Sequence, residues 1–215
     1  MAALTFSDFD YYASSAAIEA INDTETVVEG TGSLLIARVS GTSTEQLTYA
    51  PKTPAQVQGT TFGAMRLLMS IEELHSPSQA TGLLCMQSQR DLTATGEAYG
   101  LRWAPVSGRL SIIKILDGLV NAGDITELAF VTGITGSLRS VQITWRVAAD
   151  TASIRFTVTT GTALDFSDLA LAFSVTDNDS PLITTVTEGG FYNDGGAGEG
   201  FMVRYDQLGL RGVFA

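Results

Sequence analysis

Residues 97–118 read EAYGLRWAPVSGRLSIIKILDG, and the pattern of this stretch predicts the fold. In residues 99–103 large apolar side chains alternate with glycine and arginine, which is the period of a strand with one buried face. Residues 104–108 hold a proline, a serine and a glycine, a turn cluster of hairpin length. Residues 109–116 are apolar at odd and even positions, as in a central strand covered on both faces. The stretch therefore predicts a hairpin to which further strands are added.

The rest of the chain repeats this texture, with strand-like runs separated by Gly, Ser, Thr, Asn, Asp and Pro. Roughly eleven short runs of this kind predict an all-β sandwich or barrel. Residues 14–21 are compatible with one or two helical turns, and residues 41–61 with a long loop or a weak edge hairpin. The expected strands are residues 34–39, 62–71, 82–87, 99–103, 109–116, 125–131, 138–147, 153–159, 169–175, 183–187 and 201–210.

The expected hydrophobic core follows from the alternation within these strands, because residues two apart point to the same face. Apolar side chains that recur at this spacing are expected to pack between two sheets. The single cysteine, Cys85, lies in the apolar run GLLCMQ and is expected to be a buried, inert thiol. The predicted core residues are Leu101, Trp103, Ile112, Val141, Ile143, Trp145, Phe156, Leu171 and Phe173.

Composition limits the partners of the chain. It carries 12 basic and 23 acidic residues, a net charge of −11, and no basic cluster that would neutralise phosphates. We therefore expect no binding to nucleic acid or to an anionic membrane surface. No apolar run approaches the ~20 residues of a membrane span. The first ten residues, MAALTFSDFD, lack the basic and apolar regions of a signal peptide.

The order of the motifs between residues 99 and 210 gives a more specific expectation. These motifs are Tyr99-Gly-Leu-Arg-Trp103, Gly108-Arg-Leu-Ser-Ile-Ile-Lys114, the tryptophan-bearing run 138–147, Asp177-Asn-Asp-Ser-Pro181, Gly189-Gly-Phe191 and Val203-Arg-Tyr-Asp-Gln-Leu-Gly-Leu210. In this order they resemble the concanavalin A-like jelly roll of legume lectins and laminin-G domains. The resemblance implies an all-β, antiparallel β-sandwich, which we expect over residues 33–215. Residues 1–32 carry apolar side chains without a long strand pattern, and we expect an N-terminal arm that packs on the sandwich or on a neighbour.

The chain lacks the catalytic patterns of jelly-roll enzymes. Glycosidases of this fold place two carboxylates on one strand face, typically as Glu-x-Asp-x-Glu, and the chain has no such triplet. Glu25 and Glu29 flank a valine at the middle position, and the adjacent Glu72 and Glu73 would point to opposite faces of a strand. The lyase pattern requires a histidine and a tyrosine on the concave face, whereas the single histidine, His75, lies in an expected loop. The sequence therefore predicts that the chain is not an enzyme.

One glycine-rich segment is a candidate ligand site. Residues 189–200, expected to be a loop, carry Phe191, Tyr192, Asn193 and Asp194. Aromatic rings beside amide and carboxylate groups are what a sugar site requires, and lectins of the family use similar loops. A flexible connection between two strands is the alternative interpretation.

A cation site is the second candidate, and it rests on the resemblance. In the family the first and last strands lie side by side, and calcium often sits between acidic residues there. This implies a calcium site at Asp8, Asp10 and Asp206, with solvated surface carboxylates as the alternative. Residues 177–179 do not have the spacing of a calcium-binding EF-hand loop and predict an Asx turn instead.

The expected function is a structural or adhesive component of a virus particle, such as a capsid decoration, fibre or tail protein of a tailed phage. Proteins with this fold usually act outside cells, and phage structural proteins reach the exterior by lysis without a signal peptide. Only 16% of the residues are charged, which is typical of a chain covered by neighbours. We therefore expect a homo-oligomer located in the virion and in contact with other virion proteins, with a host-surface glycan as a further partner. The alternative is a free carbohydrate-binding lectin or module.

Overall fold

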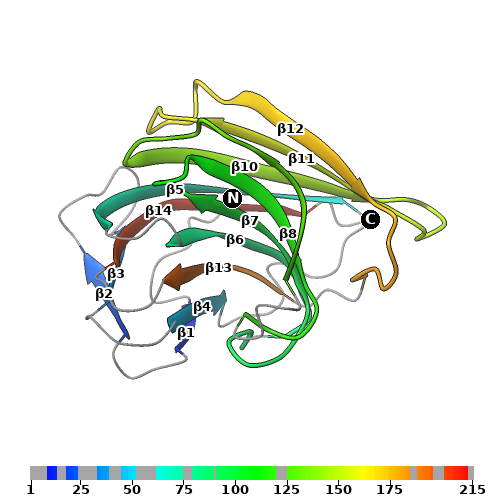
Figure 1. Ribbon diagram of the computed structural model, residues 1–215, viewed down its shortest axis with the longest axis horizontal. Coiled ribbons are helices and arrows are strands. Elements are labelled where there is room, and N and C mark those ends of the chain that lie inside the picture. The colour runs from blue at the N-terminus through cyan, green and yellow to red at the C-terminus, as the bar shows by residue number, and fades with distance from the viewer. Residues whose placement is uncertain are drawn as a thin grey trace.

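The computed structural model describes residues 9–13, 18–23, 33–38, 45–51, 62–74, 79–89, 91–119, 125–184, 188–195 and 201–212. Within these residues, fourteen strands form two stacked antiparallel sheets of seven strands each (Figure 1). No helix long and apolar enough to cross a membrane occurs in this part of the chain. The expected antiparallel β-sandwich is therefore confirmed.

Sheet A contains the central hairpin and is built from seven strands. Their order across the sheet is β1 (Phe9–Ala13), β4 (Glu45–Pro51), β13 (Glu188–Gly195), β6 (Ala80–Gln87), β7 (Ala98–Ala104), β8 (Arg109–Ile115) and β9 (Ile125–Val131). The predicted hairpin is confirmed, because β7 and β8 pair with Trp103 opposite Leu110 and are joined by the turn at residues 105–108. Gly108 closes this turn with a φ of 63°, a value that favours glycine.

Sheet B covers one face of sheet A. Its strands, in order, are β12 (Ala170–Asp177), β11 (Ile154–Gly161), β10 (Leu138–Val147), β5 (Phe62–Leu74), β14 (Phe201–Gly212), β3 (Ser33–Arg38) and β2 (Ile18–Asp23). In Figure 1 this sheet runs from β12 at the top to β2 at the lower left, and sheet A lies against it. The apolar faces of the two sheets meet and form the core.

The predicted core is confirmed at eight of its nine positions. Seven of these residues belong to the buried cluster between the sheets, and Phe173 packs against it; the seven are Leu101, Trp103, Ile112, Val141, Ile143, Trp145 and Phe156. The exception is Leu171, which is 68% exposed. A register shift between Val158 and Thr159 in the pairing of β11 with β12 breaks the alternation, so Leu171 no longer shares a face with Phe173. Cys85 is buried as expected, and burial raises the pKa of its thiol above the ordinary value.

Four strands lie where the sequence predicted none, or only a weak one. β1 and β2 fall within the expected N-terminal arm, residues 1–32, and each lies at one edge of its sheet, β1 in sheet A and β2 in sheet B. The helical turns expected at residues 14–21 are wrong, because residues 18–23 form β2 and pair with β3. β4 lies in the expected loop or weak edge hairpin at residues 41–61, and β13 replaces the expected loop after residue 188. The strand expected at residues 183–187 is absent at 183 and 184, and residues 185–187 lie outside the described part of the chain.

Candidate functional site

The face of sheet A that points away from sheet B is divided into two halves. On one half, apolar side chains of the sheet are covered by segments that connect its strands, and the backbone N–H of Leu119 donates to the carbonyl of Leu92 at 2.8 Å. The buried cluster on this half consists of Leu84, Leu92, Ala98, Ile113, Ile115, Leu119 and Tyr192. The polar side chains of this face lie at the other end of β7, β8 and β9.

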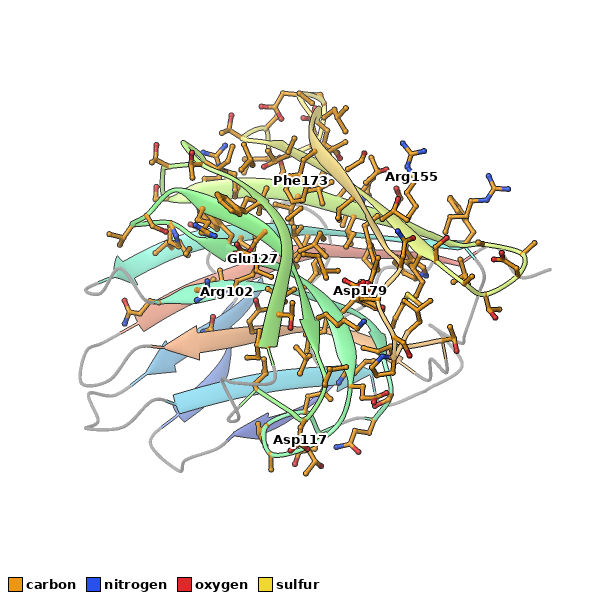
Figure 2. All side chains as sticks on the ribbon, turned by 45° about the vertical axis from the view of Figure 1, so that its right-hand side comes forward. Arg102, Asp117, Glu127, Arg155, Phe173 and Asp179 are labelled. Carbon is orange, nitrogen blue, oxygen red and sulfur yellow. The ribbon has the colours of Figure 1, made fainter. Side chains whose placement is uncertain are left out.

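Five side chains form a polar and aromatic group on this second half, and we call them the face cluster: Arg102, Arg109, Ser111, Glu127 and Phe130. Arg102 on β7 lies opposite Ser111 on β8, and Ser111 lies opposite Phe130 on β9, so these three share one face of the sheet. Phe130 is 50% exposed, whereas Ser111 is fully buried. Figure 2 shows Arg102 and Glu127 close together, and Arg155 on the opposite sheet.

A β-bulge in β9 brings Glu127 and Phe130 to the same face. Residues three apart in a regular strand point to opposite faces. Here the register shifts between Ile112 and Ile113, so that Ile112 lies opposite Ala129 and Ile113 opposite Glu127. Leu128 is the extra residue and packs against the core between the sheets. The bulge therefore turns both Glu127 and Phe130 outward, next to the arginines of β7 and β8.

Arg109 connects the aromatic and acidic members of the face cluster. Its Nε donates a hydrogen bond to Glu127 Oε2 at 2.9 Å, and its Nη2 donates to Oε1 of the same carboxylate. Its Cζ lies 3.5 Å from the centroid of the Phe130 ring, so the guanidinium also stacks on that ring. The side chains of Arg109 and Glu127 are 36% and 25% exposed, so the pair is accessible from outside.

The charges of this pair are stabilised by each other. The hydrogen bond from Arg109 lowers the pKa of Glu127, against an opposing effect of desolvation, and Ser111 and the charge of Arg102 lower it further. Hydrogen bonding to Glu127 in turn raises the pKa of Arg109. At neutral pH the face cluster therefore holds a carboxylate and two guanidinium ions next to an exposed aromatic ring.

The predicted ligand residues lie on β13, a central strand of sheet A and not a loop. Tyr192 and Asn193 are adjacent on this strand, so they point to opposite faces, and both are buried. Phe191 and Asp194 pair through the backbone with Tyr49 and Gln46 of β4, and their side chains lie outside the described residues. The four residues therefore lie on two opposite faces of one sheet and do not form the single loop surface that was predicted. Their role in ligand binding stays a prediction.

Tyr192 lies in the same cross-strand row as the face cluster. It is opposite Gly82 of β6, which in turn lies opposite Arg102. A Cβ at Gly82 would lie 1.7 Å from the carbonyl oxygen of Leu101 and 3.2 Å from Tyr192 Cε1, so this position requires glycine. The row links the predicted segment to the face cluster through Gly82, but Tyr192 itself is fully covered.

The predicted cation site falls on strands of different sheets. Asp10 lies on β1 of sheet A, whereas Asp206 lies on β14 of sheet B and is opposite Leu68 of β5. The expectation that the first and last strands lie side by side is therefore wrong, since β1 pairs with β4 and β14 with β3 and β5. Asp8 lies outside the described residues. Among the side chains that the structure describes, no group of three metal-ligating residues occurs, and calcium binding stays a prediction.

A buried ionic network lies on the opposite face of β7 and β8 and was not expected from the sequence. Lys114 Nζ contacts Asp177 Oδ2 at 2.8 Å and donates to the carbonyl of Asp179 at 2.6 Å. The hydroxyl of Tyr99 donates to the same Asp177 oxygen at 2.6 Å. The predicted Asx turn is confirmed, because the N–H of Asp179 donates to Asp177 Oδ1 at 3.0 Å. The network ties β7 and β8 of sheet A to the end of β12 in sheet B.

Burial and pairing act in opposite directions on the network. Desolvation raises the pKa of Asp177, but the hydrogen bonds from Lys114, Tyr99 and the Asp179 backbone outweigh it, so the pKa lies below its ordinary value. The pKa of Tyr99 is raised by desolvation first and by its bond to Asp177 second. The network is therefore an ion pair with a neutral tyrosine, closed off from solvent, and its position favours a structural role.

No family model matches the chain, and no curated protein sequence matches it. Solved structures do resemble it. The carbohydrate-binding module CBM66 from Bacillus subtilis has a TM-score of 0.52 and 12% identity over 91% of this chain and 95% of its own. A legume lectin-like domain from Entamoeba histolytica has a TM-score of 0.53 and 13% identity over 92% and 91%. Together with the two antiparallel sheets, these likenesses identify the fold as the lectin-like, concanavalin A-like jelly roll that the sequence motifs predicted.

The prediction that the chain is not an enzyme is wrong, because this fold does not exclude an enzyme. Alginate lyase A1-II′ has a TM-score of 0.52 and 12% identity over 90% of this chain and 85% of its own. An enzyme therefore shares the architecture. The missing Glu-x-Asp-x-Glu triplet concerns glycosidases alone, and His75, on which the absence of a lyase pattern was based, lies outside the described residues. Neither observation decides whether the chain catalyses a reaction.

Proposed function

We propose that the chain binds carbohydrate through the face cluster on the outer face of sheet A. The observation that carries this proposal is the contact of Arg109 with both Glu127 and the half-exposed Phe130. Sugar rings present apolar C–H faces and a rim of hydroxyls, so they are bound by an aromatic surface beside planar hydrogen-bonding groups. The face cluster offers this combination on β7, β8 and the edge strand β9, whose backbone pairing holds the side chains at fixed positions. A carbohydrate-binding module and a lectin-like domain among the similar structures support the proposal.

A different interpretation of the same contacts is a surface ion pair that serves stability alone. An exposed pair of this kind contributes little to stability, so its loss would change the melting temperature little. A ligand site would instead lose affinity when the aromatic ring is removed, because burial of the ring against the sugar supplies much of the binding energy. Affinity and stability therefore separate the two interpretations.

The test is a glycan array with the full chain, followed by isothermal titration calorimetry on the glycans that bind. We expect Phe130→Ala and Arg109→Ala each to weaken binding about tenfold or more, with little change in the melting temperature. Arg155→Ala is the matched control, because Arg155 is an exposed arginine on β11 of sheet B, away from the face cluster. Binding that is unchanged in Phe130→Ala, or an array without any bound glycan, would contradict the proposal.

We also propose, as a second function, that the chain is a component of a virus particle. The low content of charged residues, 16%, supports it, as do large apolar side chains that are exposed on the described surface. These residues are Phe62, Val106, Phe130, Leu164 and Leu171. In this setting the chain would form a homo-oligomer or contact other virion proteins, and the face cluster would bind a glycan of the host surface. Light scattering of the purified chain and mass spectrometry of particles from its source are the tests; a monomer that is absent from particles would contradict this proposal.

A further inference from the structure

The face cluster brings two arginines and one glutamate together on a chain whose net charge is −11. The Debye length at physiological ionic strength is about 8 Å, so distant acidic residues are screened and nearby charges dominate the field at the site. A ligand bound at the face cluster therefore meets two guanidinium groups at close range, although the chain as a whole is acidic.

The hydrogen-bonding geometry of Arg109 also leaves room for an anion. Glu127 uses the Nε and one Nη2 donor of the guanidinium. The guanidinium has further N–H donors in its plane, and among the described residues no hydrogen bond to another partner is found for them. These donors form a planar fork that matches a carboxylate or a sulfate, and stacking on Phe130 holds the plane in place.

We propose that the ligand of the face cluster is an acidic glycan whose carboxylate or sulfate groups are bound by Arg102 and Arg109. This inference rests on the proposed carbohydrate-binding function and names the ligand class of the same site. Phe130 contacts the apolar face of a sugar ring, and the two arginines bind its anionic substituents. Glu127 holds Arg109 in place and also competes with the ligand for that guanidinium.

The role of Glu127 separates an acidic ligand from a neutral one. A neutral sugar would use the Glu127 carboxylate as a hydrogen-bond acceptor, so Glu127→Gln would weaken its binding. An acidic ligand is repelled by the carboxylate and shares a donor group with it, so Glu127→Gln would strengthen its binding. The same substitution is therefore expected to change affinity in opposite directions for the two ligand classes.

The experiment is titration calorimetry of the full chain at pH 7 with three probes of similar length: an oligogalacturonate, a sulfated heparin oligosaccharide and a neutral glucan. We expect at least one acidic probe to bind and the neutral glucan to bind at least tenfold more weakly. Arg102→Ala and Arg109→Ala are each expected to weaken acidic binding by about tenfold or more, and Glu127→Gln to strengthen it several-fold. Arg102→Gln is the second variant if Arg102→Ala does not fold, and Arg155→Ala is the control of equal charge.

The possible outcomes distinguish this inference from the proposed function. Binding of the neutral glucan that depends on Phe130 and is weakened by Glu127→Gln would overturn the acidic-ligand inference and leave the proposed function in place. Acidic binding that Arg155→Ala weakens as much as Arg102→Ala would overturn the inference, because it would reflect general charge attraction. Acidic binding that survives Phe130→Ala would overturn the proposed site itself. The carboxylate and sulfate probes identify which anionic group is preferred.

Discussion

Replacement of Lys114 by methionine is the sharpest test of the buried network. Methionine keeps the length and much of the volume of the side chain but removes the charge. Asp177 would then remain an uncompensated carboxylate whose side chain is 0% exposed, held by Tyr99 and the Asp179 backbone alone. Removal of one partner from a buried ion pair costs about 3–5 kcal/mol. For a domain of this size that loss corresponds to a melting temperature lower by about 6–20 °C.

The measurement is urea unfolding at pH 7, read by tryptophan fluorescence and by circular dichroism to check two-state behaviour. The control is the triple variant Lys114→Met, Asp177→Leu and Tyr99→Phe, which removes every polar side chain of the network. A buried ion pair contributes little more to stability than apolar residues of similar volume, so this variant should recover most of the lost stability. A single Lys114→Met variant that loses less than about 1 kcal/mol would refute the reasoning, since it would mean that Asp177 is solvated in the folded chain.

The pH dependence of the same variant gives an independent check. The pKa of Asp177 is lowered in the folded chain, so its contribution to stability is present above the unfolded value of about 3.9 and is lost as the pH falls through the folded pKa. Without Lys114, desolvation has less opposition and the folded pKa of Asp177 rises. We therefore expect acid unfolding of Lys114→Met to begin at higher pH than in the unaltered chain. Coincident acid transitions would contradict the proposed role of Lys114.

Three further predictions concern stability. Trp145→Ala should cost about 3–5 kcal/mol in urea unfolding as a large-to-small core change, whereas Leu171→Ala should cost less than about 0.5 kcal/mol because Leu171 is exposed; equal costs would contradict the observed register. Gly82→Ala should lower the melting temperature strongly, because its Cβ would meet the backbone oxygen of Leu101, and an unchanged value would mean that β6 and β7 can separate. Stability should fall as the pH rises above about 10, because the pKa of Tyr99 is raised on folding and the unfolded tyrosine ionises first; Tyr99→Phe should reduce that loss in an alkaline titration, and the same loss in the variant would be evidence against it.

The sequence predicted the elements whose pattern is set by burial on one or two faces. β7 and β8 were found because residues 97–118 combine clear alternation, a compact turn and an apolar central strand. β13 was missed because its glycines and polar residues favour a loop, and its strand conformation depends on pairing with β4 and β6. β2 was missed because residues 14–21 have helical propensity, which pairing with β3 overrides.

The buried network was not predictable by the same means. Lys114 lies between Ile113 and Ile115 in a largely apolar strand, and Asp177 was interpreted only through its Asx turn. Their contact joins residues 63 positions apart across two sheets, so no local spacing indicates it. Tyr99 was interpreted only as part of the alternating run 99–103, and its hydrogen bond to Asp177 depends on the same packing.

The face cluster depends on the β-bulge in β9, which the regular alternation of a strand does not predict. Glu127 and Phe130 are three residues apart, so regular alternation would place them on opposite faces and would separate the acid from the ring. The bulge at Leu128 removes this separation, and Leu128 can occupy the extra position because its side chain packs into the core between the sheets. Considered alone, Arg102 and Glu127 each resemble ordinary solvated positions of a half-buried strand. Because β7 and β8 carry Arg102, Arg109 and Ser111 on one face and the network residues Tyr99 and Lys114 on the other, the contacts between the sheets also fix the strands on which the face cluster is built.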